Sequence, residues 1–187
     1  MILLLTVLLG IGSWRMDPSR KAFGIFIGVF VLQFLVSGFL FGLSLRPPSW
    51  LPGQVLAPGF WAAFGDARWY FLKSQELTLV NLAPLAEHPP SAWHVLLMGL
   101  AGWKLPFPEL GALWMNGLLH VAVPLGAYAF LRATSGPKAA FWGGLGMALL
   151  PSGYLYAGQL LREPLIWLIL ICGIGLVLII RTLRGTP

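Results

Sequence analysis

Residues 64–70, with the sequence FGDARWY, place the carboxylate of Asp66 two positions before the guanidinium of Arg68 and beside aromatic rings. A carboxylate in this setting is suited to accept a proton as a general base or to bind a metal ion. A structural role is the alternative, in which Asp66 caps a helix at a membrane surface and pairs with Arg68 or Lys73. The residue types alone leave both roles open.

A second candidate lies at Glu87 and His88, which precede the diproline 89–90, and His94 follows six residues after His88. A metal site needs three or four convergent ligands, and few such groups are close in this sequence. We therefore predict no resident metal, with a divalent cation as the alternative. The diproline favours a rigid turn into a helix at 91–103, and hydrogen bonding of a substrate by His88 is a second interpretation.

Three further polar side chains lie at the start of long apolar runs or inside them. Glu163 precedes Pro164 at the start of the last run, where helix-end electrostatics favours an acid without any function. An acid at that depth can also line a cavity and bind a substrate. Asn116 and His120 are four residues apart, so they share one helix face, and we expect both to form hydrogen bonds across a helix interface.

The composition shows which environment must hold these groups. The 187-residue chain has 58% hydrophobic and only 10% charged residues, with a mean hydropathy of +0.82. Soluble domains carry about 25% charged residues, so we predict a multi-pass protein of the cell (inner) membrane. The net charge of +6 comes from residues spread thinly at the ends of apolar runs. This spread indicates topology signals and contacts with anionic lipid, and no nucleic acid partner.

Four apolar runs are long enough to cross the hydrocarbon core as helices, since each reaches roughly 25 Å or more. They cover residues 22–45, 110–131, 139–161 and 164–180. Two shorter stretches, 2–14 and 91–103, reach only roughly 20 Å each. The first lacks the basic region and cleavage site of a signal peptide, so we expect a retained helix that is tilted or partly inserted. The predicted fold is an all-α integral membrane protein with a single polytopic domain, 1–187.

The basic residues decide whether 91–103 crosses. If this stretch stays at the surface, seven of the twelve basic residues lie on the cytoplasmic side, and otherwise only five do. The seven are Arg15, Arg20, Lys21, Arg132, Lys138, Arg181 and Arg184. We therefore expect Lys138 and Arg184 to face the cytoplasm, and Asp66 and Lys104 to face outward. Asp17 is then the one acid on the cytoplasmic side.

This topology makes residues 46–109 one extracytoplasmic loop, long enough to carry helices of its own. The diproline 47–48 ends the first crossing, and residues 60–82 mix aromatic and charged residues as interfacial helices do. Ser91 is suited to cap the helix 91–103, which carries a tryptophan near each end. We expect these juxtamembrane helices to lie on the outer membrane surface or to dip into it.

Three short motifs accompany the expected crossings. GDARWY at 65–70 and HPP at 88–90 lie in the outer loop, and LREPL at 161–165 opens the last crossing. Their order resembles the N-terminal half of the GT-C superfamily of polyprenyl-phosphate-sugar glycosyltransferases, the class of protein O-mannosyltransferases and aminoarabinose transferases. The resemblance covers about residues 20–185.

The resemblance implies a protein related to glycosyl transfer from a polyprenyl-phosphate sugar on the extracytoplasmic face. Asp66 would be the catalytic base toward an acceptor hydroxyl. Arg68 and His88 would lie near the donor phosphate, and Glu163 would be a further substrate-binding residue. Family enzymes continue with several more crossings, so we expect this chain to be incomplete as an enzyme alone: half of a split enzyme, a truncated product or a non-catalytic module.

A structural subunit of a larger membrane protein complex is the competing interpretation. Glycines at 143, 144 and 146, and at 173 and 175, would let the backbones of partner helices approach closely. The sequence has no Walker-type loop, GxSxG, HExxH or CxxC motif, so it gives no support to the soluble-type nucleotide-binding, hydrolase and zinc-protease classes. Its single Cys172 excludes an intrachain disulfide. The expected partners are membrane lipids, a lipid-linked sugar and other membrane protein chains.

Overall fold

The computed structural model describes residues 2–46, 55–57, 60–61, 65–77, 81, 83–87, 91–102, 108–158 and 162–183. In chain order the elements are α1 (Ile2–Met16), α2 (Lys21–Leu45), β1 (Val55–Ala57), β2 (Phe60–Trp61), α3 (Gly65–Gln75), α4 (Ala83–Glu87), α5 (Ala92–Gly102), α6 (Pro108–Ser135), α7 (Pro137–Ala148), α8 (Pro151–Ala157) and α9 (Glu163–Leu183). Apart from the short antiparallel pair β1–β2, the described elements are helices, as the composition predicts.

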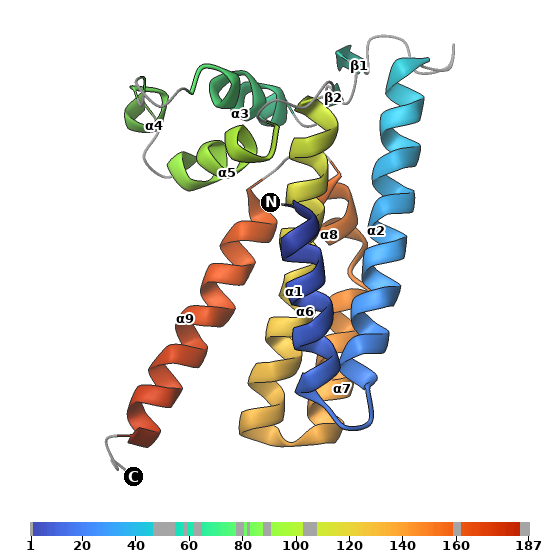
Figure 1. The fold of residues 1–187 in the computed structure, drawn as a ribbon, viewed down its shortest axis with the longest axis vertical. Coiled ribbons are helices and arrows are strands. Elements are labelled where there is room, and N and C mark those ends of the chain that lie inside the picture. The colour runs from blue at the N-terminus through green and yellow to red at the C-terminus, as the bar shows by residue number, and fades with distance from the viewer. Residues whose placement is uncertain are drawn as a thin grey trace.

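Helix α6 is the central element of a bundle, and it packs against α1, α2, α5, α7, α8 and α9 (Figure 1). Short connections at 17–20 and 136 join α1 to α2 and α6 to α7, so these neighbours run antiparallel. The core between them is apolar, with Ile25, Phe26 and Val29 of α2 packed against residues of α6 and α7. Both short connections and the end of α9 lie at one end of the bundle (Figure 1).

Two of the described helices, α2 and α6, are long and apolar enough to cross a membrane. They have 25 and 28 residues, which correspond to roughly 37 and 42 Å. Their positions match the runs expected at 22–45 and 110–131. The apolar stretch at 2–14 is the helix α1, and the run at 164–180 lies within α9.

The expected helix over residues 139–161 is divided into α7 and α8. Pro151 is the first residue of α8, and Leu150 before it has an extended backbone with φ −69° and ψ 112°. Proline has no N–H to bond the carbonyl four residues earlier, and it disfavours helical geometry in the residue before it. The chain therefore ends one helix at Ala148 and begins another at once.

Helices α3, α4 and α5 lie crosswise over the other end of the bundle (Figure 1). The helix expected at 91–103 is present as α5, and the segment 60–82 contains the shorter helix α3. Ala67 and Phe71 of α3 and Met98 of α5 form a second buried cluster with residues of α6. This cluster attaches the crosswise layer to the central helix.

Two of the glycines that are expected to face partner chains, Gly143 and Gly144, instead pack against α6 of the same chain. A Cβ atom on Gly143 would collide with Leu131 Cδ1, and one on Gly144 would lie 3.2 Å from Tyr128 Cβ and 3.3 Å from the carbonyl oxygen of Pro124. Both glycines therefore permit the close packing of α7 on α6. A Cβ atom on Gly146 would meet nothing within 4 Å.

We expect Gly144→Leu to lower the stability of the protein by about 1–3 kcal/mol, because the added side chain overpacks the contact between α6 and α7. Gly146→Leu is the matched control, because position 146 lies on the same helix with open space around it. This variant should unfold at the same temperature as the wild type. Thermal unfolding in detergent measures both. Equal stability of the two variants would contradict the packing described for α7.

Candidate functional site

Tyr70 of GDARWY, Arg162 of LREPL and Ser91, which follows HPP in the sequence, are connected by hydrogen bonds near α3 and α5. Arg162, directly before α9, donates from Nη1 to Ser91 Oγ at 3.0 Å, and Ser91 Oγ donates to the phenolic oxygen of Tyr70 on α3 at 3.5 Å. Ser91 directly follows the diproline and is 3% exposed. Its hydroxyl, which is expected to cap α5, also bonds these distant segments. One chain of polar contacts thus joins residues 70, 91 and 162.

Two ionisable groups lie next to these contacts. His94 on α5 is buried, and its ring packs edge-on against the ring of Tyr70 with 5.2 Å between centroids. Glu163, next to Arg162, has a buried carboxylate oxygen, Oε2, with no hydrogen-bond partner in the described part of the chain. A buried acceptor that receives no hydrogen bond lowers the stability of the folded state. Glu163 is therefore suited to accept a hydrogen bond from a ligand. We call residues 70, 91, 94, 162 and 163 the motif cluster.

The predicted catalytic residue, Asp66, lies in the first turn of α3 and is exposed, as is Arg68. Among the described residues neither side chain has a hydrogen-bond or ion-pair partner, while Lys73 lies 3.0 Å from Glu76. The carboxylate of Asp66 is therefore open to solvent on the same helix as Tyr70. His88 lies outside the described residues, so its place near this site stays a prediction.

The structure offers no ready cation site in the parts of the chain that it describes. In those parts no three side chains of His, Cys, Asp or Glu come together. Cys172 is a free, exposed thiol on α9. The divalent cation considered as an alternative gains no support from these residues.

Asn116 and His120 form hydrogen bonds between helices, as their spacing predicts. Asn116 Nδ2 donates to the carbonyl oxygens of Tyr156 and Ala157 at the end of α8, at 3.3 and 3.2 Å. His120 Nδ1 lies 2.7 Å from Gln33 Oε1 on α2. Gln33, His120 and Asn116 are all buried. Bonds of this kind satisfy polar groups that have no water around them.

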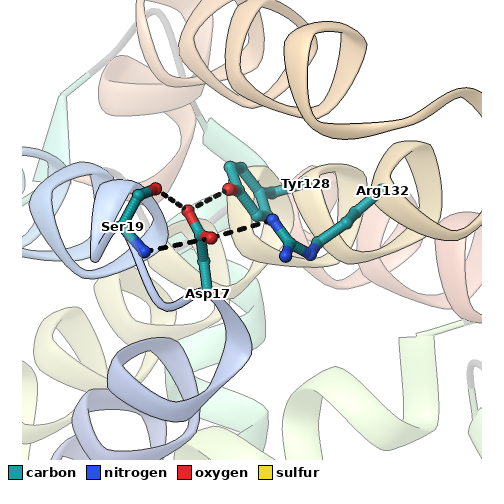
Figure 2. Close-up of polar contacts among 4 residues, drawn as sticks. All are labelled: Asp17, Ser19, Tyr128 and Arg132. Atoms are coloured by element: carbon teal, nitrogen blue, oxygen red, sulfur yellow. Dashed lines mark hydrogen bonds and ion pairs between the residues drawn. The ribbon is translucent and has the colours of Figure 1, made fainter.

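A third polar group lies at the opposite end of the bundle from the motif cluster. Figure 2 shows Asp17, in the turn between α1 and α2, bonded to Ser19, Tyr128 and Arg132. The Tyr128 phenol donates to Asp17 Oδ2 at 2.7 Å, and Arg132 Nη1 lies 2.9 Å from Oδ1. The Ser19 hydroxyl donates to Oδ2, and the Ser19 amide donates to Oδ1 at 3.3 Å. We call these four residues the Asp17 cluster.

The Asp17 cluster connects the turn between α1 and α2 to the last two turns of α6. Hydrogen bonds from Ser19 and Tyr128, together with the Arg132 guanidinium, hold the pKa of the Asp17 carboxyl well below its usual range. The sequence predicts that Asp17 is the one acid on the cytoplasmic side but does not identify its partners. The available signal was the turn sequence Asp17-Pro18-Ser19, in which an aspartate side chain accepts a bond from the residue two positions later.

Comparisons of the chain with protein-family models, with curated proteins and with solved structures find no match. No role can therefore be carried over from a relative.

The Asp17 carboxylate should make stability depend on pH. The pKa of the Asp17 carboxyl is lower in the folded than in the unfolded chain. Its contribution to folding stability is therefore complete above the unfolded-state pKa, about 4, and is lost as the pH falls toward the folded-state pKa. Asp17→Asn removes the titrating group. The difference in unfolding temperature between the wild type and this variant should stay constant from about pH 7 to 5 and shrink below about pH 4. A difference that does not change with pH would contradict the contribution of the charge.

Proposed function

We propose that this chain is a multi-pass membrane protein that contributes to glycosyl transfer from a polyprenyl-phosphate sugar on the extracytoplasmic face. The observation that carries the proposal is the contact chain from Tyr70 through Ser91 to Arg162. It connects Tyr70 of GDARWY, Ser91 directly after HPP and Arg162 of LREPL, three residues that lie far apart in sequence. The exposed Asp66 belongs to the same crosswise layer.

The arrangement of the bundle supports four crossings. Besides α2 and α6, the pair α7–α8 covers residues 137–157 and α9 has 21 residues, so each reaches roughly 30 Å. The end of α6, whose last turn carries Arg132, and the start of α7, whose first turn carries Lys138, lie opposite α3 and α5 (Figure 1). This separation agrees with a cytoplasmic basic end and an extracytoplasmic layer that contains Asp66.

The proposed chemistry assigns one role to each charged group. Asp66 accepts the proton of the acceptor hydroxyl as its oxygen bonds to the anomeric carbon of the donor sugar. The bond from that carbon to the phosphate oxygen breaks, and the polyprenyl phosphate leaves with the electron pair. The guanidiniums of Arg68 and Arg162 are suited to pair with this phosphate. The buried oxygen of Glu163 is suited to accept a hydrogen bond from a sugar hydroxyl.

A structural role in a larger membrane complex is the second candidate, and α9 favours it. Cβ atoms at Gly173 and Gly175 would meet nothing within 4 Å. The side chains around them are apolar and more than half exposed: Ile169, Leu170, Ile174, Leu176 and Val177. Such a face could pack against a helix of another membrane protein.

Replacement of Asp66 separates the two candidates. Asp66→Asn keeps the shape of the side chain but cannot accept the proton, so transfer should fall by about 10²- to 10⁴-fold while expression and assembly stay normal. Glu76→Gln is the matched control, because it removes an exposed carboxylate close to the end of α3 without changing transfer. Sugar transfer in isolated membranes, together with the glycan profile of the cells, measures both variants.

A normal glycan profile in the Asp66→Asn strain would contradict the catalytic proposal. Loss of a partner complex in a Gly173→Leu or Gly175→Leu strain with an unchanged profile would favour the structural role. Both glycines have space for a larger side chain within this chain, so their replacement tests contacts with other chains.

A further inference from the structure

An open apolar groove of about 410 Å³ runs between α2 and α7, at the end of the bundle that carries the basic residues. Gly24, Gly28 and Leu32 form its wall on α2, and Phe141 and Leu145 form its wall on α7. The groove exists because α2 has glycines where larger side chains would fill it. A Cβ atom on either glycine would meet nothing within 4 Å.

The groove has a basic entrance. Lys21, the first residue of α2, lines it and is exposed, with Nζ 5.4 Å from the centroid of the Phe141 ring. Lys138 is exposed and lies one helical turn before Phe141, on the same face of α7. No carboxylate belongs to the described lining of the groove, and the nearby Asp17 is bonded to Arg132. Lys21 therefore lies at the mouth of the apolar groove with no carboxylate in the described lining, and Lys138 lies one turn before Phe141 on the same face of α7.

The length of the groove matches one leaflet of a bilayer. Lys21 and Leu32 are eleven residues apart on α2, which corresponds to roughly 16 Å along the helix. Half of a typical hydrocarbon core is about 15 Å thick. A chain that enters beside the lysines would therefore reach the middle of the membrane at Leu32.

We infer that this groove binds one anionic phospholipid of the cytoplasmic leaflet, with its phosphate between Lys21 and Lys138 and one acyl chain along Gly24 and Gly28. The positive charge at the mouth and the apolar walls match the two parts of such a molecule. The inference rests on the membrane location proposed above but not on glycosyl transfer. Its failure would leave the Asp66 experiment unaffected.

The test uses the purified full chain in mild detergent, titrated with dioleoylphosphatidylglycerol or dioleoylphosphatidylcholine and followed by native mass spectrometry. The wild type should retain one phosphatidylglycerol and bind it at least about fivefold more tightly than phosphatidylcholine. Lys21→Gln and Lys138→Gln should each weaken phosphatidylglycerol binding by about fivefold and leave phosphatidylcholine binding unchanged. Gly28→Leu, which fills the groove, should weaken binding of both lipids.

Two matched controls should bind both lipids like the wild type. Arg15→Gln removes a cation at the same end of the bundle but outside the groove, and Gly42→Leu adds the same side chain to an open position farther along α2. Unfolding temperatures confirm that each variant is folded.

Equal binding by the groove variants and their controls would overturn the inference. It would also be overturned if the wild type retained no lipid but formed dimers that Gly28→Leu dissociates, since the groove would then bind a second copy of the chain. Sedimentation in detergent distinguishes this outcome.

Discussion

The polar groups of α6 find partners inside the chain, because a helix buried among apolar side chains has little water to bond. Asn116 bonds the end of α8, His120 bonds Gln33 on α2, and Arg132 bonds Asp17 in the turn between α1 and α2. Bonds of the kind made by Asn116 and His120 contribute about 0.6–2 kcal/mol each inside a membrane. Each one connects α6 to a different neighbour, so the arrangement of the bundle depends on this one helix.

This constraint links the middle of the bundle to the motif cluster. The bonds from Asn116 hold the last residues of α8, and the described chain resumes at Arg162, a few residues later. Ser91, the partner of Arg162 in this hydrogen bond, directly precedes α5, and α5 packs on α6. The position of the proposed site therefore depends on the hydrogen bonds that Asn116 of α6 makes to the end of α8.

The sequence predicts the helices and the interhelical bonds of Asn116 and His120 because both follow from short-range periodicity. It does not reveal that Pro151 starts a new helix rather than lying within one, since proline also occurs inside helices, as Pro124 does in α6. The partners of Asp17, Ser91 and Gln33 could not be predicted. Each is bonded to a residue more than 70 positions away, and such contacts depend on how the helices pack.

In the proposed topology, the Asp17 cluster and the layer with Asp66 lie on opposite sides of a membrane. Labelling of single cysteines at positions 68 and 138, in a Cys172→Ser background, tests it most directly, because both side chains are exposed at opposite ends of the bundle. A membrane-impermeant thiol reagent should label position 68 in intact cells and position 138 only after the cytoplasmic side is opened. Labelling of both positions from the same side would contradict this account of the protein.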